Sequence, residues 1–327
     1  MSVISVKDLK KTYQVHQKEP GFSGSLKSLF NRKYLDVNAV DGVSFSIDEG
    51  ELVGFIGPNG AGKTTTLKVL SGLLYPSAGE VSVLGFTPWE RKAEFQMQFS
   101  LVMGQKNQLW WDLPALESFI LNKEIYEIPE KKFRETLDNL VELLEVKDLL
   151  KVQVRKLSLG QRMKMELIAA LIHSPKILFL DEPTIGLDVV MQKKMRDFIK
   201  EYNKNFKSTI ILTSHYMEDV KELCQRVIVI DKGQILYDGR LSEIVSKFAN
   251  QKTITATFNK EVTRSELAKI GTIKEFDYPR AVLSVKRAAV ADSAAKLLQT
   301  FPVADLDIEE PSIEEVIREV FSRKAKS

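Results

Sequence analysis

A glycine-rich run reads Gly57-Pro58-Asn59-Gly60-Ala61-Gly62-Lys63-Thr64 and matches the pattern G-x-x-x-x-G-K-S/T. Glycines let backbone N–H groups turn inward as a nest for an anion, and a following helix adds the positive end of its dipole. Lys63 can reach the β- and γ-phosphates of a nucleotide, and the Thr64 hydroxyl can bind Mg²⁺. The run, extended by Thr65, therefore predicts a nucleotide-binding site.

An acidic pair follows an apolar run further along the chain. The stretch "ILFLDEP" has the composition of a buried strand and ends in Asp181 and Glu182. Ligands of open α/β sheets bind at the carboxyl ends of the strands. Asp181 is therefore the expected partner of the magnesium ion, and Glu182 is placed to polarise an attacking water as a general base.

The elements that must position these residues alternate between strands and helices. The stretch "AVDGVSFSIDEGELVGFIG" predicts two strands separated by the turn Asp48-Glu49-Gly50, and the second strand runs directly into the glycine-rich loop. Near the start, "VISVKDLKKTYQV" alternates as an edge strand of an antiparallel sheet would. From about Lys92 to Ser174 the periodicity is mostly helical, with the clearest amphipathic helix in "KKFRETLDNLVELL".

Near Phe248 the pattern changes to strand–helix–strand–strand–helix–strand with a closing helix. This is the order of a split βαβ or ferredoxin-like domain. We therefore predict an α/β phosphate-loop domain over residues 1–247, with a helical subdomain at about 92–175. An accessory α+β domain is predicted over 248–327.

The order of the motifs resembles that of ATP-binding subunits of the ABC transporter family over residues 1 to about 245. Besides the phosphate loop and "LFLDEP" at the Walker B strand, the matching residues are Tyr13 at the adenine-stacking aromatic, Gln105 at the glutamine loop, "LSLGQ" from Leu157 at the signature LSGGQ, Gly186-Leu187-Asp188 at the D-loop and His215 of "LTSH" at the switch histidine. Two assignments have competitors. Tyr13 could instead be a packed strand aromatic, and Gln108 rivals Gln105 for the glutamine loop.

The resemblance implies a P-loop NTPase core, with a mixed sheet and helices, an antiparallel β subdomain and a helical subdomain. It also implies that two subunits, most simply a homodimer, pack head to tail around two ATP–Mg²⁺. In that arrangement the signature residues contact ATP held by the other subunit; they are Ser158, Leu159, Gly160 and Gln161. Leu159 replaces the usual glycine, so its side chain must point away from the nucleotide.

By the same resemblance, Glu182, His215 and Gln105 are the catalytic residues, and Asp188 acts in the D-loop. The magnesium ligands are Thr64, Gln105 and Asp181. The C-terminal domain, "PTIGLD" and "TSHYMED" resemble the bacterial drug, polysaccharide and antibiotic exporter branch. The expected partners are integral membrane permease subunits, of which there can be two different kinds.

Composition agrees with this location and these partners. Within the sequence, no apolar run reaches the roughly 20 residues of a membrane-spanning helix. We therefore expect the chain at the cytoplasmic face of the cell membrane, peripheral through the permease. A net charge of +3 gives no electrostatic argument for a nucleic-acid partner. The single Cys224 suits a reducing compartment and predicts a small buried side chain.

Two segments keep alternative interpretations. Trp110 and Trp111 predict either an interface with the permease or part of the core of the helical subdomain. The insert from His16 to Asn38 contains "SLKSLFNRKYL", which fits either a short amphipathic helix near the membrane or a surface excursion.

A non-transport ABC ATPase acting on ribosomes or DNA is the alternative function. Ribosome-acting members usually carry two ATPase cores in one chain, and this sequence has one. The DNA-repair members split the core with long coiled coils, for which the interval between Lys63 and Asp181 is too short.

Overall fold

The computed structural model describes residues 2–16, 34–104, 106–214, 216–248, 251–310 and 316–317. It divides the chain into two compact units, Met1–Asp238 and Gly239–Ser327. The predicted domain boundary lies nine residues later, after residue 247, so α9 (Leu241–Phe248) is counted here with the second unit. Most of the insert, residues 17–33, lies outside the described residues, whereas Tyr34–Asn38 belongs to a strand.

The first unit contains two sheets. The antiparallel sheet has the order β2-β1-β4, with β1 at Ser2–His16, β2 at Tyr34–Asp48 and β4 at Ala78–Val83. The larger sheet has the order β5-β6-β7-β3-β8-β9. Its strands are β3 Leu52–Ile56, β5 Phe99–Met103, β6 Ile177–Asp181, β7 Thr209–Thr213, β8 Arg226–Asp231 and β9 Gln234–Arg240. The strands from β5 to β8 are parallel, so the carboxyl ends of β3 and β6 lie at one edge of the sheet.

The position of β1 differs from the prediction. β1 hydrogen-bonds to β2 on one side and to β4 on the other, so it is the central strand and not an edge strand. Alternation along a strand indicates that one face is buried and says nothing of how many neighbours pair with the backbone. Ile4, Val6 and Leu9 point into the core from this central position.

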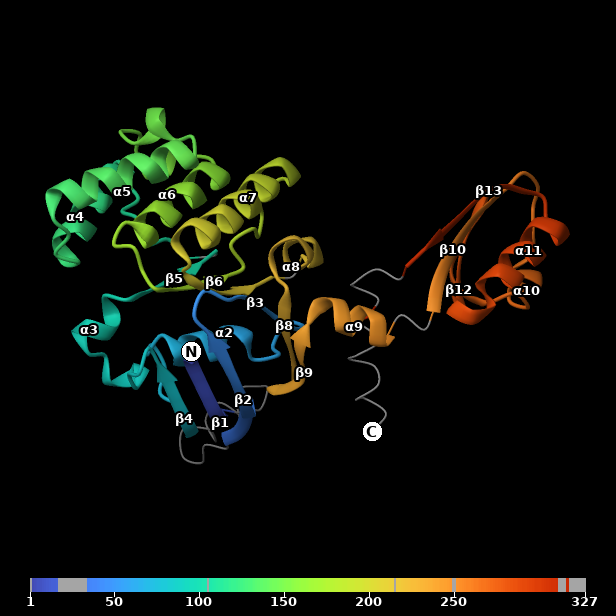
Figure 1. Cartoon of the computed structure of the whole chain (residues 1–327), viewed down its shortest axis with the longest axis horizontal. Coiled ribbons are helices and arrows are strands. Elements are labelled where there is room, and N and C mark those ends of the chain that lie inside the picture. The colour runs from blue at the N-terminus through green and yellow to red at the C-terminus, as the bar shows by residue number, and fades with distance from the viewer. Residues whose placement is uncertain are drawn as a thin grey trace, which may run out of the picture. The chain divides into compact units, whose positions relative to one another are not determined.

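Helices cover both faces of the larger sheet (Figure 1). α2 (Lys63–Leu70) lies between the two sheets and contributes Leu67 and Leu70 to the core that they share. The opposite side carries α4 Ala115–Ile125, α5 Glu130–Leu143, α6 Leu159–Leu171 and α7 Val189–Phe206. Shorter helices are η1 Pro88–Glu90, α3 Ala93–Gln96, η2 Lys147–Leu149, η3 Val154–Lys156 and α8 Met217–Leu223.

The amphipathic helix of the central region is confirmed as α5. Its buried side chains include Leu137, Leu140 and Val141, with Leu144 buried directly after the helix. The interval 92–175 is not helical throughout, however, because β5 lies within it and pairs with β6 of the large sheet. The helices α4, α5 and α6 follow that strand.

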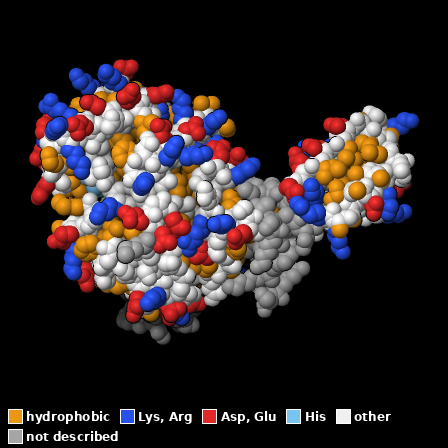
Figure 2. Space-filling view, in the orientation of Figure 1, with side chains coloured by type: hydrophobic (Ala, Val, Ile, Leu, Met, Phe, Trp, Pro, Cys, Tyr) orange, Lys and Arg blue, Asp and Glu red, His pale blue; other side chains and the backbone are white. Residues whose placement is uncertain are grey.

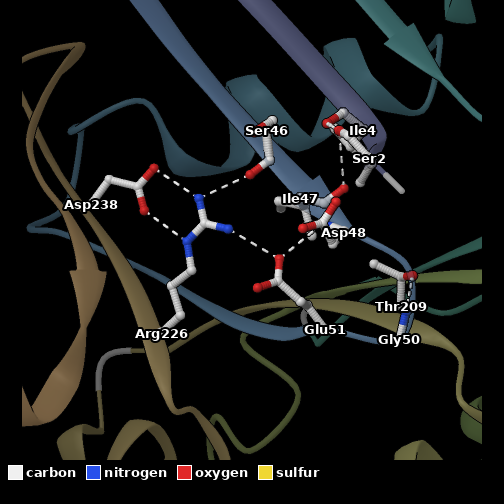
Figure 3. A network of polar contacts seen from close by, with 10 residues as sticks. All are labelled: Ser2, Ile4, Ser46, Ile47, Asp48, Gly50, Glu51, Thr209, Arg226 and Asp238. Carbon is white, nitrogen blue, oxygen red and sulfur yellow. Dashed lines mark hydrogen bonds and ion pairs between the residues drawn. The ribbon is translucent and has the colours of Figure 1, made fainter.

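At the amino ends of the parallel strands, Arg226 ties three strands and a turn together (Figure 3). Its guanidinium donates to both carboxylate oxygens of Asp238, at 2.8 and 2.9 Å, and to Glu51 Oε2 at 3.0 Å. It also donates to the carbonyl oxygen of Ser46 at 2.9 Å. This network joins β2, β8, β9 and the turn before β3 at the end of the sheet opposite the glycine-rich loop, so it supports the site without entering it.

The second unit has the predicted order of elements: β10 Gln251–Phe258, α10 Arg264–Leu267, β11 Thr272–Asp277, β12 Arg280–Lys286, η4 Arg287–Ala289, α11 Val290–Thr300 and β13 Val303–Glu309. Its antiparallel sheet has the order β11-β12-β10-β13, which is ferredoxin-like. Its separate core includes Ile254, Leu283 and Leu297. Most of the predicted closing helix lies outside the described residues.

The surface of the first unit carries charges of both signs. Lys and Arg side chains alternate with Asp and Glu over the visible face of the first unit, without a large field of one sign (Figure 2). Cys224 is buried, as predicted, and burial raises the pKa of its thiol. None of the helices in the described part of the chain combines the length and the apolarity needed to span a membrane.

Candidate nucleotide-binding site

The glycine-rich loop connects β3 to α2 and depends on two glycines for its path. A Cβ on Gly57 would lie 2.1 Å from the carbonyl oxygen of Ile230, so no other residue fits there. Gly62 has a φ of +108°, and a Cβ on it would lie 2.4 Å from the carbonyl oxygen of Ala39. Gly62 also caps α2, which directs the amino end of that helix at the loop.

Lys63 lies folded over this loop. Its ammonium donates to the carbonyl oxygens of Gly57 at 2.7 Å and Pro58 at 3.0 Å. Burial lowers the pKa of Lys63, and the nearby carboxylates of Glu182 and Asp181 oppose that shift. A buried cation whose hydrogen bonds go to loop carbonyl oxygens is a suitable partner for phosphate oxygens.

Thr64 and Asp181 come together from the two predicted motifs. The Thr64 hydroxyl donates to the Asp181 carboxylate at 2.9 Å, and the Thr213 hydroxyl donates to the other carboxylate oxygen at 2.7 Å. Thr64 and Asp181 are the hard oxygen donors that Mg²⁺ prefers, and phosphate oxygens and waters usually complete its shell. The pair therefore fits a magnesium ion bound together with a nucleotide.

Glu182 follows with an unusual backbone. Its φ is +56°, in the left-handed region that non-glycine residues seldom adopt. Its N–H donates to both the hydroxyl and the carbonyl oxygen of Thr213, at 3.1 Å each. Gly104 packs against it closely, because a Cβ there would lie 2.2 Å from the Glu182 carbonyl oxygen. Strained backbone that neighbours hold in place is typical of functional sites.

The signature segment forms the amino end of α6. Ser158 is its N-cap and accepts a hydrogen bond from the Gln161 N–H at 3.2 Å, while the Gln161 side chain accepts from the Ser158 N–H at 2.9 Å. This capping box leaves Ser158 exposed. Ser158 therefore caps the helix and also faces solvent at its amino end.

Leu159 and Gly160 pack against the D-loop region of the same chain. A Cβ on Gly186 would lie 3.0 Å from Leu159 Cδ2, so the Leu159 side chain leans on the D-loop. A Cβ on Gly160 would lie 2.8 Å from Met191 Cγ on α7. Asp188 caps α7 by accepting from the Met191 N–H at 2.9 Å. Signature and D-loop therefore form one packed surface.

That surface is apolar and exposed where α7 begins. Val189 and Val190 directly follow Asp188 and are 77% and 68% exposed. Within the described ranges, no hydrogen bond or ion pair joins Leu157–Gln161 to the phosphate loop. The phosphate-loop half and the signature half are thus separate parts of this chain.

Of the remaining predicted site residues, Gln105 and His215 lie outside the described residues. Gln108, the rival of Gln105, donates from its side chain to the carbonyl oxygen of Leu101 at 2.6 Å. Tyr13 lies on β1 opposite Val37 and is 36% exposed, with Lys11 Nζ 5.3 Å from the ring centroid. It is therefore not a core aromatic.

The tryptophan pair is not in the core of the helical region. Trp110 and Trp111 are 53% and 47% exposed, so the interpretation in which one or both pack inside is wrong. The Arg162 guanidinium of α6 lies 5.4 Å from the Trp111 ring centroid. The pair lies at the surface in the segment between β5 and α4, and large apolar side chains at a surface mark interaction sites.

Known proteins match both units. A family model described as "ABC transporter" matches residues 40–185, and one described as "EvrA-like ABC transporter, C-terminal domain" matches residues 250–309. The ABC transporter ATP-binding protein NatA of Bacillus subtilis (strain 168) is 35% identical over 215 residues, covering 66% of this chain and 87% of NatA. The chain belongs to the ABC transporter family of ATP-binding proteins.

Two further similarities agree with this family. The Nod factor export ATP-binding protein I of Burkholderia pseudomallei (strain 1710b) is 35% identical over 208 residues, covering 64% of this chain and 68% of that protein. A solved ATP-binding subunit of an ABC transporter superposes with a TM-score of 0.62 at 25% identity, covering 75% of this chain and 93% of the solved one. The predicted ABC ATPase fold is confirmed, and the chain is an ATP-hydrolysing enzyme of this family.

Thr213 is a member of this ABC site that the sequence analysis missed. Its hydroxyl donates to Asp181 and accepts from the Glu182 N–H, so it fixes both acidic residues. Its signal in the sequence was weak: a hydroxyl residue at the carboxyl end of an apolar strand. Only the parallel pairing of β6 with β7, in which Asp181 lies opposite Thr213, makes it a neighbour.

Proposed function

We propose that this chain is the ATP-hydrolysing motor subunit of an ABC exporter. Two copies would pack head to tail around two ATP–Mg²⁺ and drive separate permease subunits in the membrane. The observation that carries the proposal is the division of the site: among the described residues, no hydrogen bond or ion pair joins the phosphate-loop half to the exposed signature half.

In the phosphate-loop half, each residue has a chemical role. Lys63 would exchange its carbonyl partners for the β- and γ-phosphates, and the backbone N–H groups of residues 57–64 would donate to the phosphate oxygens. Glu182 would accept the proton of the attacking water as general base. Bound at Thr64 and Asp181, Mg²⁺ would neutralise charge on the phosphates. Gln105 and His215 are assigned to the γ-phosphate end of the site.

In the signature half, the partner's ATP would meet Ser158 and the amino end of α6. The backbone N–H groups at the amino end of α6 and the Ser158 hydroxyl are donors suited to a γ-phosphate. The Leu159 side chain packs against Gly186, which supports a helix end that is open to a ligand. The exposed pair Val189 and Val190 beside Asp188 supports a protein interface on the same face.

Tyr13 would stack on the adenine ring. It is exposed on β1, and the bulged β2 opposite it leads to Ala39, which touches the phosphate loop at Gly62. An exposed aromatic ring on the strand paired with β2, which contacts the loop, supports base stacking. A Tyr13→Ala variant should therefore raise the KM for ATP more than it lowers kcat.

Export is supported by the relative named for Nod factor export and by the accessory domain, which matches the EvrA-like C-terminal family. The permease partners would hold the chain at the cytoplasmic face of the membrane. No feature of the described residues favours a ribosome or DNA partner, and charges of both signs are interspersed over the visible face (Figure 2).

Affinity purification of the full chain from solubilised membranes tests the proposal. We expect integral membrane proteins with several spanning helices to co-purify in a fixed ratio, and their reconstitution with the chain to raise its ATP turnover. Co-purification of ribosomes, with no membrane protein whose addition changes turnover, would contradict it.

A further inference from the structure

A buried glutamate on the signature helix holds the backbone next to the tryptophan pair. Glu166 lies on α6, two turns after Ser158, and is 3% exposed. Both of its carboxylate oxygens accept from the Gln108 N–H at 3.1 Å, and one also accepts from the Leu109 N–H at 3.4 Å. A buried carboxylate is costly unless it is hydrogen-bonded, so this contact constrains where residues 108 and 109 can lie.

The same segment is attached to the signature region at two further places. One turn before Glu166, the Arg162 guanidinium lies over the Trp111 ring, 5.4 Å from its centroid. The N–H groups of Val154 and Arg155 donate to the carbonyl oxygens of Leu113 and Trp111, at 3.0 Å each. Residues 154–156 lead directly into Leu157 and Ser158. The segment that carries the tryptophans is thus attached to α6 and to its lead-in, before and after the pair.

We propose that Glu166 is a positioning residue that fixes the Trp110–Trp111 surface to the signature helix, so that the pair moves with Ser158 when ATP is engaged. The inference rests on the proposed contact of Ser158 with ATP held by a second subunit. Ser158 caps α6 and Glu166 lies about 12 Å further along the same continuous helix, and a rigid secondary element can carry coupling between two positions.

The carboxylate is required because both of its oxygens face backbone N–H donors. A glutamine has nearly the same size, yet it offers one acceptor oxygen and an NH₂ group that would face a backbone N–H. Glu166→Gln should therefore release the segment while preserving the packing volume. Glu117→Gln is the matched control, because Glu117 lies on neighbouring α4 and is exposed.

The first measurement is hydrogen exchange of the full chain without nucleotide. We expect the Gln108 and Leu109 amides to exchange at least about tenfold faster in Glu166→Gln, with the amides of α2 and α7 unchanged. Glu117→Gln should match the parent chain. Equal rates at residues 108 and 109 in all three proteins would overturn the role of Glu166, whatever the fate of the proposed function.

The second measurement follows the tryptophans themselves. The chain has three Trp, so a Trp89→Phe substitution leaves only Trp110 and Trp111. In that background, with Glu182→Gln to prevent turnover, ATP–Mg²⁺ should change acrylamide quenching as the dimer forms. Adding Glu166→Gln should leave the dimer intact by light scattering and reduce the change in quenching at least about threefold.

The outcomes separate the two proposals. An undiminished change in quenching in the dimer of the Glu166→Gln protein would overturn the coupling between ATP and the tryptophan surface. If ATP produces no dimer in the parent, the proposed head-to-tail function fails and the coupling fails with it. The hydrogen-exchange result at residues 108 and 109 does not depend on a dimer, so it still decides whether Glu166 holds the segment.

Discussion

The two halves of the candidate site are built in opposite ways. The phosphate-loop half is closed and internally bonded: Lys63 is buried against loop carbonyls, and Asp181 is held by the hydroxyls of Thr64 and Thr213. The signature half is open, with Ser158 exposed at the end of a capped helix and Val189 exposed beside the D-loop. The first half is organised to hold a ligand before a partner arrives, and the second is organised to meet one.

This difference indicates which functions each half can perform alone. Polar groups already fixed in place lose little entropy when a nucleotide binds, so the phosphate-loop half should bind ATP in a single subunit. A helix end in water contributes little to binding by itself, because solvent competes for its donors. Hydrolysis should therefore depend on a second subunit far more than binding does.

The largest expected effect comes from the base in the phosphate-loop half. Glu182→Gln should lower ATP turnover by about 100-fold or more, because removing a general base costs about 10²–10⁴-fold. ATP binding should persist, and an ATP-dependent dimer should accumulate in size-exclusion chromatography with light scattering. Turnover within a few-fold of the unmodified chain would contradict the assigned role of Glu182.

Ser158→Asp tests the signature half. Asp caps a helix as well as Ser does, so α6 should stay folded, whereas a carboxylate would repel the γ-phosphate. We expect turnover to fall at least about tenfold, with the affinity of the monomer for a fluorescent ATP analogue within about twofold. The neutral cap Ser158→Asn is the control and should retain more activity. Equal turnover in the two variants would contradict a contact between Ser158 and the γ-phosphate.

Acid should weaken the attachment of the signature helix to the sheet. His173 follows α6, its ring stacks on Tyr126 with centroids 3.8 Å apart, and Nε2–H donates to the Phe99 carbonyl oxygen on β5 at 3.3 Å. Burial is the main cause that lowers the pKa of His173 from 6.5 to about 4. Between pH 6.5 and 4 the His173 imidazole is therefore protonated in the unfolded chain and neutral in the folded chain. Stability is lost as pH falls through this range.

Urea unfolding measures this loss. The free energy of unfolding should decrease by about 2 kcal/mol from this group between pH 7.5 and pH 5. His173→Phe keeps an aromatic ring against Tyr126 and cannot titrate, so its unfolding free energy should depend less on pH over this range. Identical pH dependence in both proteins would show that His173 is not the group responsible.

The smallest effect is expected for Leu159→Gly, which restores the usual signature glycine. Because the Leu159 side chain packs against Gly186, turnover should stay within about threefold of the unmodified chain. Thermal unfolding should reveal a loss of about 1 kcal/mol, since glycine is a poor helix former. A change in turnover above tenfold, in either direction, would place the Leu159 side chain at the nucleotide.

Sequence predicted the phosphate-loop half more completely than the signature half. The loop and the pair Asp181-Glu182 are local patterns whose chemistry follows from a strand end and a helix start. The packing of Gly160 on Met191 and of Leu159 on Gly186 joins segments about thirty residues apart, and neither periodicity nor motif spacing indicates it. The same reason explains Thr213, whose role needs the register of β6 with β7.

Two other differences have the same origin. The alternation of β1 correctly predicted a strand with one buried face, but hydrogen bonding to two neighbours is a property of the sheet and not of the strand's side chains. Trp110 and Trp111 directly follow backbone that hydrogen-bonds to Glu166, a contact across 57 or 58 residues of sequence. Motifs are enough to predict the fold, whereas a full description of the site needs long-range contacts of this kind.

Mixing two inactive chains tests the central claim most directly. Lys63→Ala removes the phosphate-loop half and Ser158→Asp removes the signature half, so each protein alone should be nearly inactive. A mixed dimer contains one site with both halves intact, and a one-to-one mixture should recover about a quarter of the unmodified turnover if the sites act independently. Turnover no higher than the mean of the two separate variants would contradict a site shared between two subunits.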